Sequence, residues 1–445
     1  MKSSRSFTRR SFLKTAALAG AAPLILRSSL WGQDSTPSKQ FTLGFIGLGK
    51  QGDGLLGNCL SRRDVRVLGV SDVDTTRRDA AQKKVETEYS QAVKGGAYRG
   101  CTAYADFRDL LARKDIDAVV IATPDHWHAL IAIAAANAGK DIYCEKPLTH
   151  TVREGRALVK AVRKHKRILQ VGSMQRSMAE FRAACELVRN GVLGNVMKID
   201  VAVGGPPVFC DLPEEGIEPG LNWDFWLGPA PLRPYNSILS PRGVCRDFPN
   251  WRHYREYAGG GVCDFGAHQF DIVQWAFGCD DTGPVEFFPA EKPQAQCGVR
   301  WRYATGQEVT HQTHIGQDNG IAFYGDQGKI YVDRGRFQLW LGGQLKAEAM
   351  DDYSLLLKEL LPANAVRLYR STNHMSDWVK SMASRQPPVC DVETGHRTAT
   401  VCNLVNAVYF SGKGFKWDPR REKFAGGSGD EKWLTREYRA PWKLA

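Results

Sequence analysis

Asp264 and His268 stand four residues apart, directly after a run of three glycines, Gly259–Gly261. If this segment is helical, the spacing places both side chains on one face of the helix. A histidine oriented by a carboxylate is typical of a general base that works near neutral pH. A purely structural Asp–His contact is the alternative interpretation of the pair taken alone.

A second reactive group follows an apolar run that is typical of a buried strand. Asp141–Cys144 leads directly into Glu145-Lys146-Pro147. A lysine held at the end of a strand could stabilise charge on an alkoxide oxygen and donate a hydrogen bond to it. The alternative is a surface turn with a solvated lysine.

The segment Thr123-Pro124-Asp125-His126-Trp127-His128 also follows an apolar run, Asp117–Thr123. Ligands of open α/β sheets bind outside the carboxyl ends of the strands, so we expect this loop to face a ligand. His126 and His128 could instead cap the helix that follows, and a zinc site would need further ligands. No metal site is therefore predicted.

A glycine-rich turn, Gly47-Leu48-Gly49-Lys50-Gln51-Gly52, separates the β-rich run Phe41–Ile46 from a helix-compatible segment. A dinucleotide-binding βα unit has this order. Gly47 permits the tight turn, Gly49 lets the backbone approach a pyrophosphate, and Gly52 lets the helix pack close to the strand. The amides at the helix N-terminus would then face the phosphates.

Asp72 ends another apolar run, Val65–Asp72, and follows Gly52 by 20 positions. A carboxylate there binds ribose hydroxyls and repels a 2′-phosphate, so NAD is predicted over NADP. Arg77 and Arg78 keep NADP open, because an arginine after the acid can accept a phosphate; an ordinary helix N-cap is the structural alternative. The predicted cofactor contacts are Gly47, Gly49, Lys50, Gln51, Gly52, Asp72, Thr123, Pro124, His126, His128, Glu145 and Lys146.

The elements that must position these groups change in character along the chain. From residue 40 to 172, short apolar runs alternate with amphipathic stretches, which predicts a Rossmann-type, doubly wound parallel sheet. A long Pro/Gly-rich excursion, Gly204–Asn250, is typical of a lid, an interface or a binding loop. Strand-like runs with glycine turns from Val285 to Leu341 predict a large open, mostly antiparallel sheet in an α+β domain spanning 173–445, whose final helices could pack back on the first domain.

The composition is that of a globular protein, with 43% hydrophobic and 24% charged residues. Six Lys/Arg and no acidic residue lie in residues 1–33, so half of the formal charge of +12 belongs to that segment. No basic block is interleaved with aromatic residues, which argues against nucleic-acid binding. The eleven cysteines form no CxxC pair, and their odd number leaves at least one thiol free of intrachain bridges.

Residues 1–33 are predicted to be a targeting segment. Thr8-Arg9-Arg10-Ser11-Phe12-Leu13-Lys14 matches the twin-arginine export signature, and a moderately apolar region, Ala16–Leu26, follows it. We therefore expect a periplasmic protein that meets the twin-arginine export machinery. Ser28–Gln33 lacks a clean cleavage motif, so an uncleaved signal that anchors the protein in the membrane, facing the periplasm, is the alternative.

Taken in order, the glycine turn, the TPDHWH loop, EKP and the GGG-x-x-D-x-x-x-H segment resemble the glucose–fructose oxidoreductase/inositol dehydrogenase (Gfo/Idh/MocA) family. The resemblance implies a Rossmann domain, a C-terminal α/β domain whose open sheet forms a homo-oligomer interface, and an active site between them. It assigns Lys146 a place beside nicotinamide and substrate, and it makes Asp264 and His268 the family's Asp/His pair. Candidate substrate contacts are Gln175, Arg176, Trp251, Arg252 and Tyr254.

The resemblance implies hydride transfer between C4 of a nicotinamide and a carbinol carbon of a sugar or cyclitol. His268 would take the hydroxyl proton, Asp264 would orient His268, and Lys146 would stabilise the oxygen. Free NAD is scarce outside the cytoplasm, so an exported enzyme should hold its cofactor tightly. One alternative is redox-neutral glycoside cleavage or epimerisation, although EKP is not the motif expected of the best-known hydrolase group. The other is a non-catalytic sugar-binding protein on the same fold.

Overall fold

The computed structural model describes residues 40–95, 98–244, 246–316 and 319–444. The twin-arginine segment lies outside these residues. Within them, no helix is both long and apolar enough to cross a membrane. The ten described cysteines are all free thiols.

Six short apolar runs form a parallel sheet at the N-terminal side of the described chain. The strand order β3-β2-β1-β4-β5-β6, with every pair parallel, is that of a doubly wound dinucleotide-binding fold and confirms the predicted class. The strands are β1 (Phe41–Ile46), β2 (Val65–Ser71), β3 (Thr102–Tyr104), β4 (Ala118–Ile121), β5 (Asp141–Cys144) and β6 (Leu169–Val171).

Helices cover this sheet because their apolar sides meet its buried strands. Local caps set where they begin: Asp74 accepts a hydrogen bond from the Arg77 amide, and Thr151 and Glu154 form a capping box. The helices are α2 (Lys50–Leu60), α3 (Thr75–Glu88), α4 (Ser90–Lys94), α5 (Phe107–Ala112), α6 (Asp125–Asn137) and α7 (Val152–Lys164).

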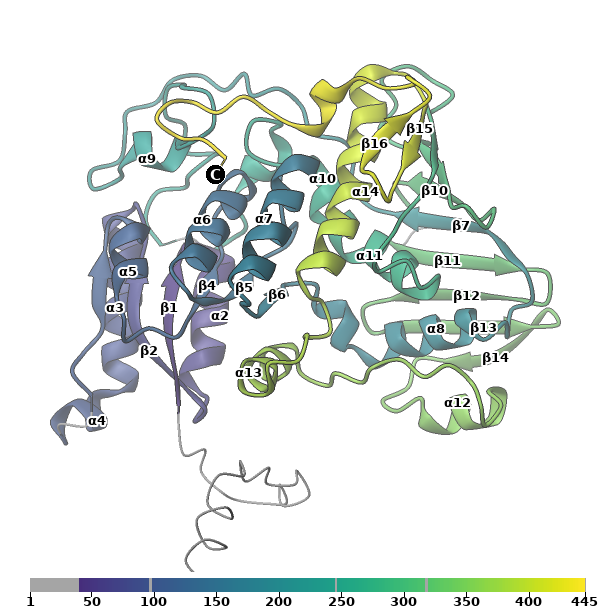
Figure 1. Ribbon diagram of the computed structural model, residues 1–445, viewed down its shortest axis with the longest axis horizontal. Helices are drawn as coiled ribbons and strands as arrows, with labels where there is room; N and C mark the ends of the chain where they lie inside the picture. The colour runs from purple at the N-terminus through teal and green to yellow at the C-terminus, as the bar shows by residue number, and fades with distance from the viewer. Residues whose placement is uncertain (1–39, 96–97, 245, 317–318, 445) are drawn as a thin grey trace, which may run out of the picture. The chain divides into compact units, whose positions relative to one another are not determined.

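A ten-stranded sheet dominates the rest of the described chain (Figure 1). Its order is β14-β13-β12-β11-β7-β10-β9-β8-β15-β16, and β7 pairs parallel with β10 while the other registered pairs are antiparallel. The predicted open, mostly antiparallel sheet is thus confirmed. The strands are β7 (Val196–Ala202), β8 (Glu286–Phe288), β9 (Arg300–Arg302), β10 (Glu308–Gln312), β11 (Gly320–Gly325), β12 (Gly328–Asp333), β13 (Arg336–Leu341), β14 (Gln344–Glu348), β15 (Phe415–Asp418) and β16 (Lys423–Ala425).

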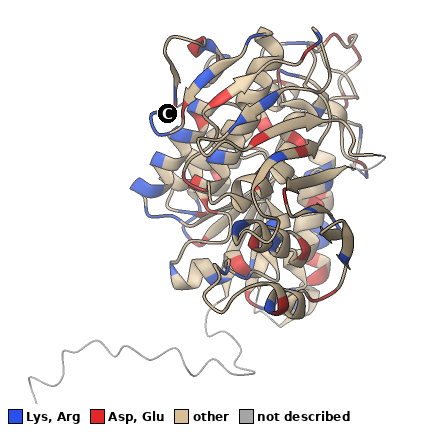
Figure 2. Ribbon diagram, turned by 90° about the vertical axis from the view of Figure 1, so that its right-hand side faces the viewer, with Lys and Arg blue, Asp and Glu red and all other residues tan. Residues whose placement is uncertain are grey.

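One face of the large sheet packs against α8 (Ala179–Arg189), α11 (Gly266–Ala276) and α14 (Val392–Ser411) in a single hydrophobic core. Charged side chains pair across strands on the sheet as well: Arg300 lies 2.7 Å and Arg302 3.1 Å from Glu308. Figure 2 shows basic and acidic residues mixed over this side of the described chain.

The late helix α13 (His374–Ser384) does not join that core. Its apolar residues, Met375, Trp378 and Met382 among them, pack with β1 and β2 in a core of the first domain. The chain therefore returns to its N-terminal domain after building most of the large sheet. A short helix, α12 (Ser354–Leu360), precedes α13 and packs in the core of the large sheet. The described 3-10 turns are η2 (Met174–Ser177), η3 (Asn250–His253) and η4 (Glu431–Leu434).

Residues 204–258, which we call the strap, have a small aromatic core of their own. Trp223 and Trp226 of α9 (Trp223–Leu227) stack with ring centroids 4.7 Å apart, and Tyr235 meets Trp223 edge-on. The strap is tied to the first domain, since the Thr75 amide donates to the Gly220 carbonyl at 3.1 Å. It is an ordered element that lies against the N-terminus of α3.

We predict that the stability of the second domain depends on Arg176, which lies near its start. Its guanidinium is 1% exposed and contacts Asp271, which is fully buried, at 2.7 Å and Asp280 at 2.7 Å. Arg176→Met leaves these carboxylates without their cation, so the free energy of unfolding should fall by about 3–5 kcal/mol. Urea denaturation measures the change. The exposed pair of Lys346 and Glu359 provides the control, because Glu359→Gln should cost less than about 1 kcal/mol. Equal effects of the two substitutions would contradict the prediction.

Candidate functional site

The glycine turn has the geometry of a phosphate-binding loop. Gly47 has φ +86°, and a Cβ on Gly52 would lie 2.0 Å from the Gly47 carbonyl oxygen, so helix α2 packs directly on the turn. A Cβ on Gly49 would meet nothing within 4 Å. Gly49 is also the N-cap of α2 and caps it with no side chain. The first amides of α2 therefore face open space, as a pyrophosphate requires.

Asp72 lies at the end of β2 beside this turn. Its carboxylate accepts hydrogen bonds from the amides of Leu48 at 2.7 Å and Asp74 at 2.9 Å. Burial raises the pKa of Asp72, and the charge of Arg77 opposes that shift. The two amide bonds fix the carboxylate at the rim of the cavity described next, where it can accept bonds from ribose hydroxyls.

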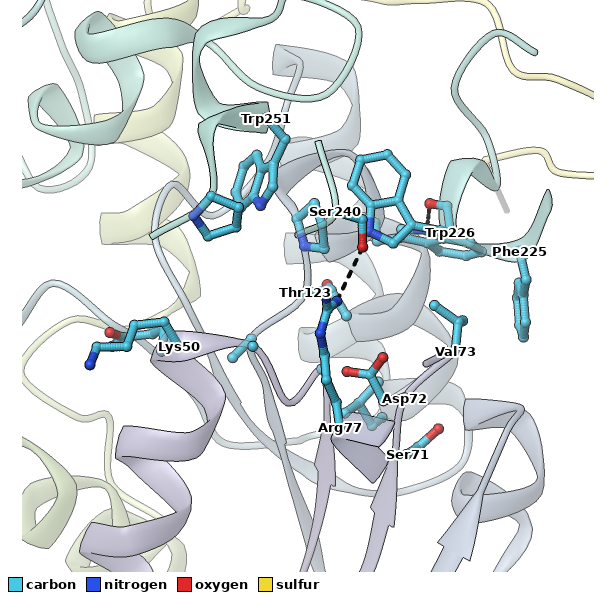
Figure 3. A pocket seen from close by; sticks show the side chains of 18 of the residues that line it. Lys50, Ser71, Asp72, Val73, Arg77, Thr123, Phe225, Trp226, Ser240 and Trp251 are labelled. Atoms are coloured by element: carbon cyan, nitrogen blue, oxygen red, sulfur yellow. Dashed lines mark hydrogen bonds between the residues drawn. The ribbon is translucent and has the colours of Figure 1, made fainter. Parts of the chain in front are cut away.

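A cavity runs from the glycine turn past Asp72 and is roofed by the strap. Figure 3 shows Trp226, Ser240 and Trp251 on the side of this cavity opposite Asp72. Arg77 crosses between the two sides, because it donates to Ser240 Oγ at 3.2 Å and to the carbonyl oxygens of Gly243 and Pro241. The strap is thereby bound to α3, the helix that follows β2 and Asp72.

A larger cavity of about 540 Å³ adjoins the first one. The two cavities share Gln51, Thr123, Trp251 and Arg252 among their lining residues. The second cavity is also lined by the three predicted catalytic residues, Lys146, Asp264 and His268. A dinucleotide bound along the glycine turn could therefore reach these side chains, which come from both domains.

Asp264 is bound to Lys146 rather than to His268. Lys146 Nζ donates to the Asp264 carbonyl at 3.0 Å and forms a short ion pair with the Asp264 carboxylate. Arg252 Nε lies 3.7 Å from the same carboxylate. Burial alone would raise the pKa of Asp264, but Lys146 and Arg252 outweigh it and hold the pKa below its usual value. The carboxylate thus stays charged and positions the lysine.

The predicted orientation of His268 by Asp264 is not the arrangement found. Helix α10 (Gly260–Asp264) ends at the aspartate and α11 begins at Gly266, so the two residues do not share one continuous helix. His268 is 4% exposed, and its Nδ1 has no partner among the described residues. Burial, followed by the charge of Lys146, holds its pKa well below 6.5. His268 is therefore a neutral imidazole at neutral pH.

The remaining predicted residues divide into two groups. Thr123, Pro124, Lys50 and Glu145 line the cavities, and Glu145 accepts a hydrogen bond from Gln51 at 2.8 Å. His126 and His128 are instead buried against backbone carbonyls: His126 Nε2 lies 3.1 Å from the Trp226 oxygen, and His128 Nδ1 lies 2.8 Å from the Pro147 oxygen. These two contacts hold the strap and the segment after β5 that carries Lys146 against α6.

The proposed substrate contacts also divide. Trp251 and Arg252 line both cavities. Gln175 and Arg176 are buried, and Arg176 is engaged with Asp271 within the second domain. Tyr254 packs against the core of the strap. The structure therefore brings two of these five residues to the cavity walls.

Sequence reasoning missed several residues that line the cavities. Asp125 lies within the TPDHWH loop, and burial, followed by the nearby charge of Asp264, raises its pKa well above the usual value. The position of Asp125 just after a strand, between Thr123 and His128, could have marked it as a candidate site residue. Arg334, between β12 and β13, and Trp226 of the strap carry no local pattern that would have marked them. Within the described ranges, no three His, Cys, Asp or Glu side chains are grouped to bind a metal ion.

Among curated proteins, similarity is confined to part of each relative. The chain is 32% identical over 172 residues to the uncharacterized oxidoreductase YrbE of Bacillus subtilis, covering 38% of this chain and 47% of the relative. It is 31% identical over 160 residues to inositol 2-dehydrogenase of Salmonella typhimurium, covering 35% and 44%. A glycosyl hydrolase family 109 protein of Shewanella pealeana is 30% identical over 211 residues, covering 44% and 45%. The matched region is thus less than half of each of these relatives.

Solved structures share the fold at low sequence identity. An aldose-aldose oxidoreductase from Caulobacter crescentus has a TM-score of 0.57 at 18% identity, covering 85% of this chain and all of the other. Levoglucosan dehydrogenase in complex with NADH and levoglucosan has a TM-score of 0.56 at 18% identity, covering 85% and 99%. These likenesses establish the architecture of both domains.

Two family models match the chain in succession. Residues 41–173 match the NAD-binding Rossmann fold of an oxidoreductase family, and residues 179–338 match that family's C-terminal alpha/beta domain. These ranges hold the glycine turn, Asp72, Lys146, Asp264 and His268. The chain belongs to the Gfo/Idh/MocA oxidoreductase family.

Proposed function

We propose that this protein is an NAD-dependent oxidoreductase that acts on a hydroxyl-bearing carbon of a sugar or cyclitol. The observation that carries the proposal is the junction of the two cavities, where a dinucleotide site opens onto Lys146, Asp264 and His268. The similarity to inositol 2-dehydrogenase supports the substrate class. The glycine turn and Asp72 would hold the nucleotide, and its nicotinamide would supply the hydride acceptor or donor.

The protein's own side chains divide the remaining work. Neutral His268 takes the proton of the substrate hydroxyl as the carbon is oxidised. Lys146 donates a hydrogen bond to the same oxygen and stabilises its developing negative charge. Asp264 holds Lys146 Nζ through its carbonyl and its carboxylate, so the ammonium group is fixed before substrate arrives.

The contacts of two arginines favour NAD over NADP. Arg77 donates to acceptors on the strap, and Arg78 donates to the Asp72 carbonyl and to Thr75 Oγ1, each at 3.1 Å. Both guanidinium groups are thus occupied within the protein, while the Asp72 carboxylate faces the ribose position. A 2′-phosphate would meet a negative charge and no free arginine here.

The strap supports a cofactor that stays bound through many turnovers. It closes the dinucleotide cavity from the side opposite Asp72 and is held by Arg77, which is 6% exposed. A resident cofactor must be restored in place, either by a second sugar or by return of the hydride to the first. The family 109 relative makes the redox-neutral route the second candidate, and the two routes differ in whether reduced cofactor accumulates with a single substrate.

We also propose that the protein is exported by the twin-arginine route and forms a homo-oligomer. The paired Arg9 and Arg10 support export. The double substitution Arg9→Lys/Arg10→Lys should retain the protein in the cytoplasm, which cell fractionation measures. The family resemblance supports assembly through the large sheet. A monomer in light scattering would contradict that part of the proposal.

The proposed function predicts a spectroscopic change in the purified protein. Adding a panel of sugars and cyclitols to the nucleotide-loaded protein should produce the near-ultraviolet absorbance of reduced nicotinamide with at least one of them. His268→Gln should bind the nucleotide as before and lose at least about 100-fold in the rate, because the proton acceptor is gone. His165→Gln, at the end of α7, is the matched control and should keep the rate. Failure to bind any nicotinamide nucleotide would overturn the proposal.

The low pKa of His268 predicts the acidic side of the pH profile. A base works only when unprotonated, so kcat/KM should fall as the pH drops through the pKa of His268 and level off above it. Because burial and Lys146 hold that pKa well below 6.5, the inflection should lie below pH 6.5. Steady-state rates between acidic and neutral pH measure it. An inflection above 6.5 would show that another group, or a solvated histidine, is titrating.

Nucleotide retention should depend on the Arg77 anchor. Arg77→Met removes the bonds that hold the strap over the cavity, so the Kd for NAD should rise at least about tenfold, equivalent to about 1.4 kcal/mol. Fluorescence titration and retention through gel filtration measure the effect. Arg246→Met changes an exposed arginine of the same segment and should leave the Kd unchanged. Equal Kd values for the two variants would contradict the role of the anchor.

A further inference from the structure

A third cavity, of about 360 Å³, lies between the strap, α14 and the C-terminal segment around η4. None of its lining residues lines the dinucleotide cavity or the Lys146–His268 cavity. Its size falls within the range of small-molecule sites. It is therefore a separate site candidate to which the proposed redox chemistry assigns no role.

Arg255 is the main charged group of this third cavity. Its Cζ lies 4.1 Å from the ring centroid of Phe410, 4.7 Å from that of Phe209 and 5.5 Å from that of Trp433. Aromatic rings at these distances hold a guanidinium in place by cation–π attraction, and delocalisation keeps its N–H donors in one plane. The aromatic residues thus preorganise a planar set of donors.

These donors have no acceptor among the described residues. The neighbouring carboxylate, Glu256, accepts instead from the Cys210 amide, with both oxygens at 3.2 Å. Burial lowers the pKa of Arg255, and the charge of Glu256 opposes that shift without cancelling it. The guanidinium of Arg255 therefore has no hydrogen-bonded carboxylate partner in the described chain, and a carboxylate or phosphate could bind it through two parallel hydrogen bonds.

Two amide side chains on α14 add unpaired polar atoms to the same cavity. Asn406 is 4% exposed; its Nδ2 donates to the Gly259 carbonyl at 2.8 Å, while its Oδ1 has no partner in the described chain. Asn403, one helical turn earlier, has an unpartnered Nδ2. A buried amide left unpaired is unfavourable by about 1–3 kcal/mol, so a ligand that bonded these atoms would remove that cost. Hydroxyl groups can both donate to Asn406 and accept from Asn403.

We propose that this cavity binds an acidic monosaccharide, with its carboxylate or phosphate on Arg255 and its hydroxyl groups on Asn403 and Asn406. The aromatic rings offer an apolar surface against which a sugar ring packs. Lys432 and Arg436 also line the cavity, but each already lies within 2.9 Å of a carboxylate oxygen. The proposal is independent of the redox function, since it concerns binding alone.

Calorimetric titration of the nucleotide-loaded protein tests this proposal. Glucuronate and glucose 6-phosphate separate the two anion types, glucose lacks the anion, and inorganic phosphate lacks the sugar. We expect one acidic sugar to bind at least tenfold more tightly than either glucose or phosphate. Binding of phosphate as tight as that of the sugar phosphate, or no saturable binding of either acidic sugar, would overturn the proposal.

Variants then locate the binding. Arg255→Met should weaken the acidic sugar at least tenfold, whereas Arg421→Met, at an arginine whose side chain is 82% exposed, should not. If Arg255→Met does not fold, Asn403→Asp places a negative charge in the cavity and should weaken the anion similarly. His268→Gln should leave this affinity unchanged. An affinity that responds to His268→Gln and not to the cavity variants would place the sugar in the other site and refute the proposal.

Discussion

The ion pair between Lys146 and Asp264 is the contact on which the active-site arrangement depends. Lys146 follows β5 of the parallel sheet, and Asp264 ends α10 in the second domain, so one interaction joins the two domains at the reacting groups. Both side chains are mostly buried, which strengthens their attraction relative to a surface pair. Arg252 adds a third charge from the strap. Any shift between the domains would therefore separate Lys146 from Asp264 at the wall of the second cavity.

The break between α10 and α11 gives Asp264 and His268 different surroundings, whereas one continuous helix would place them on the same face. Asp264 turns toward Lys146, while His268 lies one helix further on with a free ring nitrogen. A carboxylate bonded to the histidine would raise its pKa, whereas burial beside a lysine lowers it. The geometry thus keeps the imidazole unprotonated in the same cavity as the ion pair of Lys146 and Asp264.

Local patterns predicted the elements that local physics determines. The glycine turn and the bounds of β1 and β5 follow from residues adjacent in sequence. The partner of Asp264 and the burial of Arg176 depend on residues more than 90 positions away, which no spacing rule reveals. The length and composition of Gly204–Asn250 predict most of the strap as a lid, an interface or a binding loop. Its contact with Arg77 is visible only in the tertiary structure.

Helix α13 completes the core of the first domain although it lies late in the sequence. The core that contains β1 and β2 also contains Trp378 and Met382, which follow β2 by more than 300 residues. The first domain therefore lacks part of its interior until well after its last strand, β6, has been made. Contacts of such sequence separation slow folding, because a long loop must close before they form. We therefore expect the nucleotide-binding domain to reach its final packing only after α13 has been made.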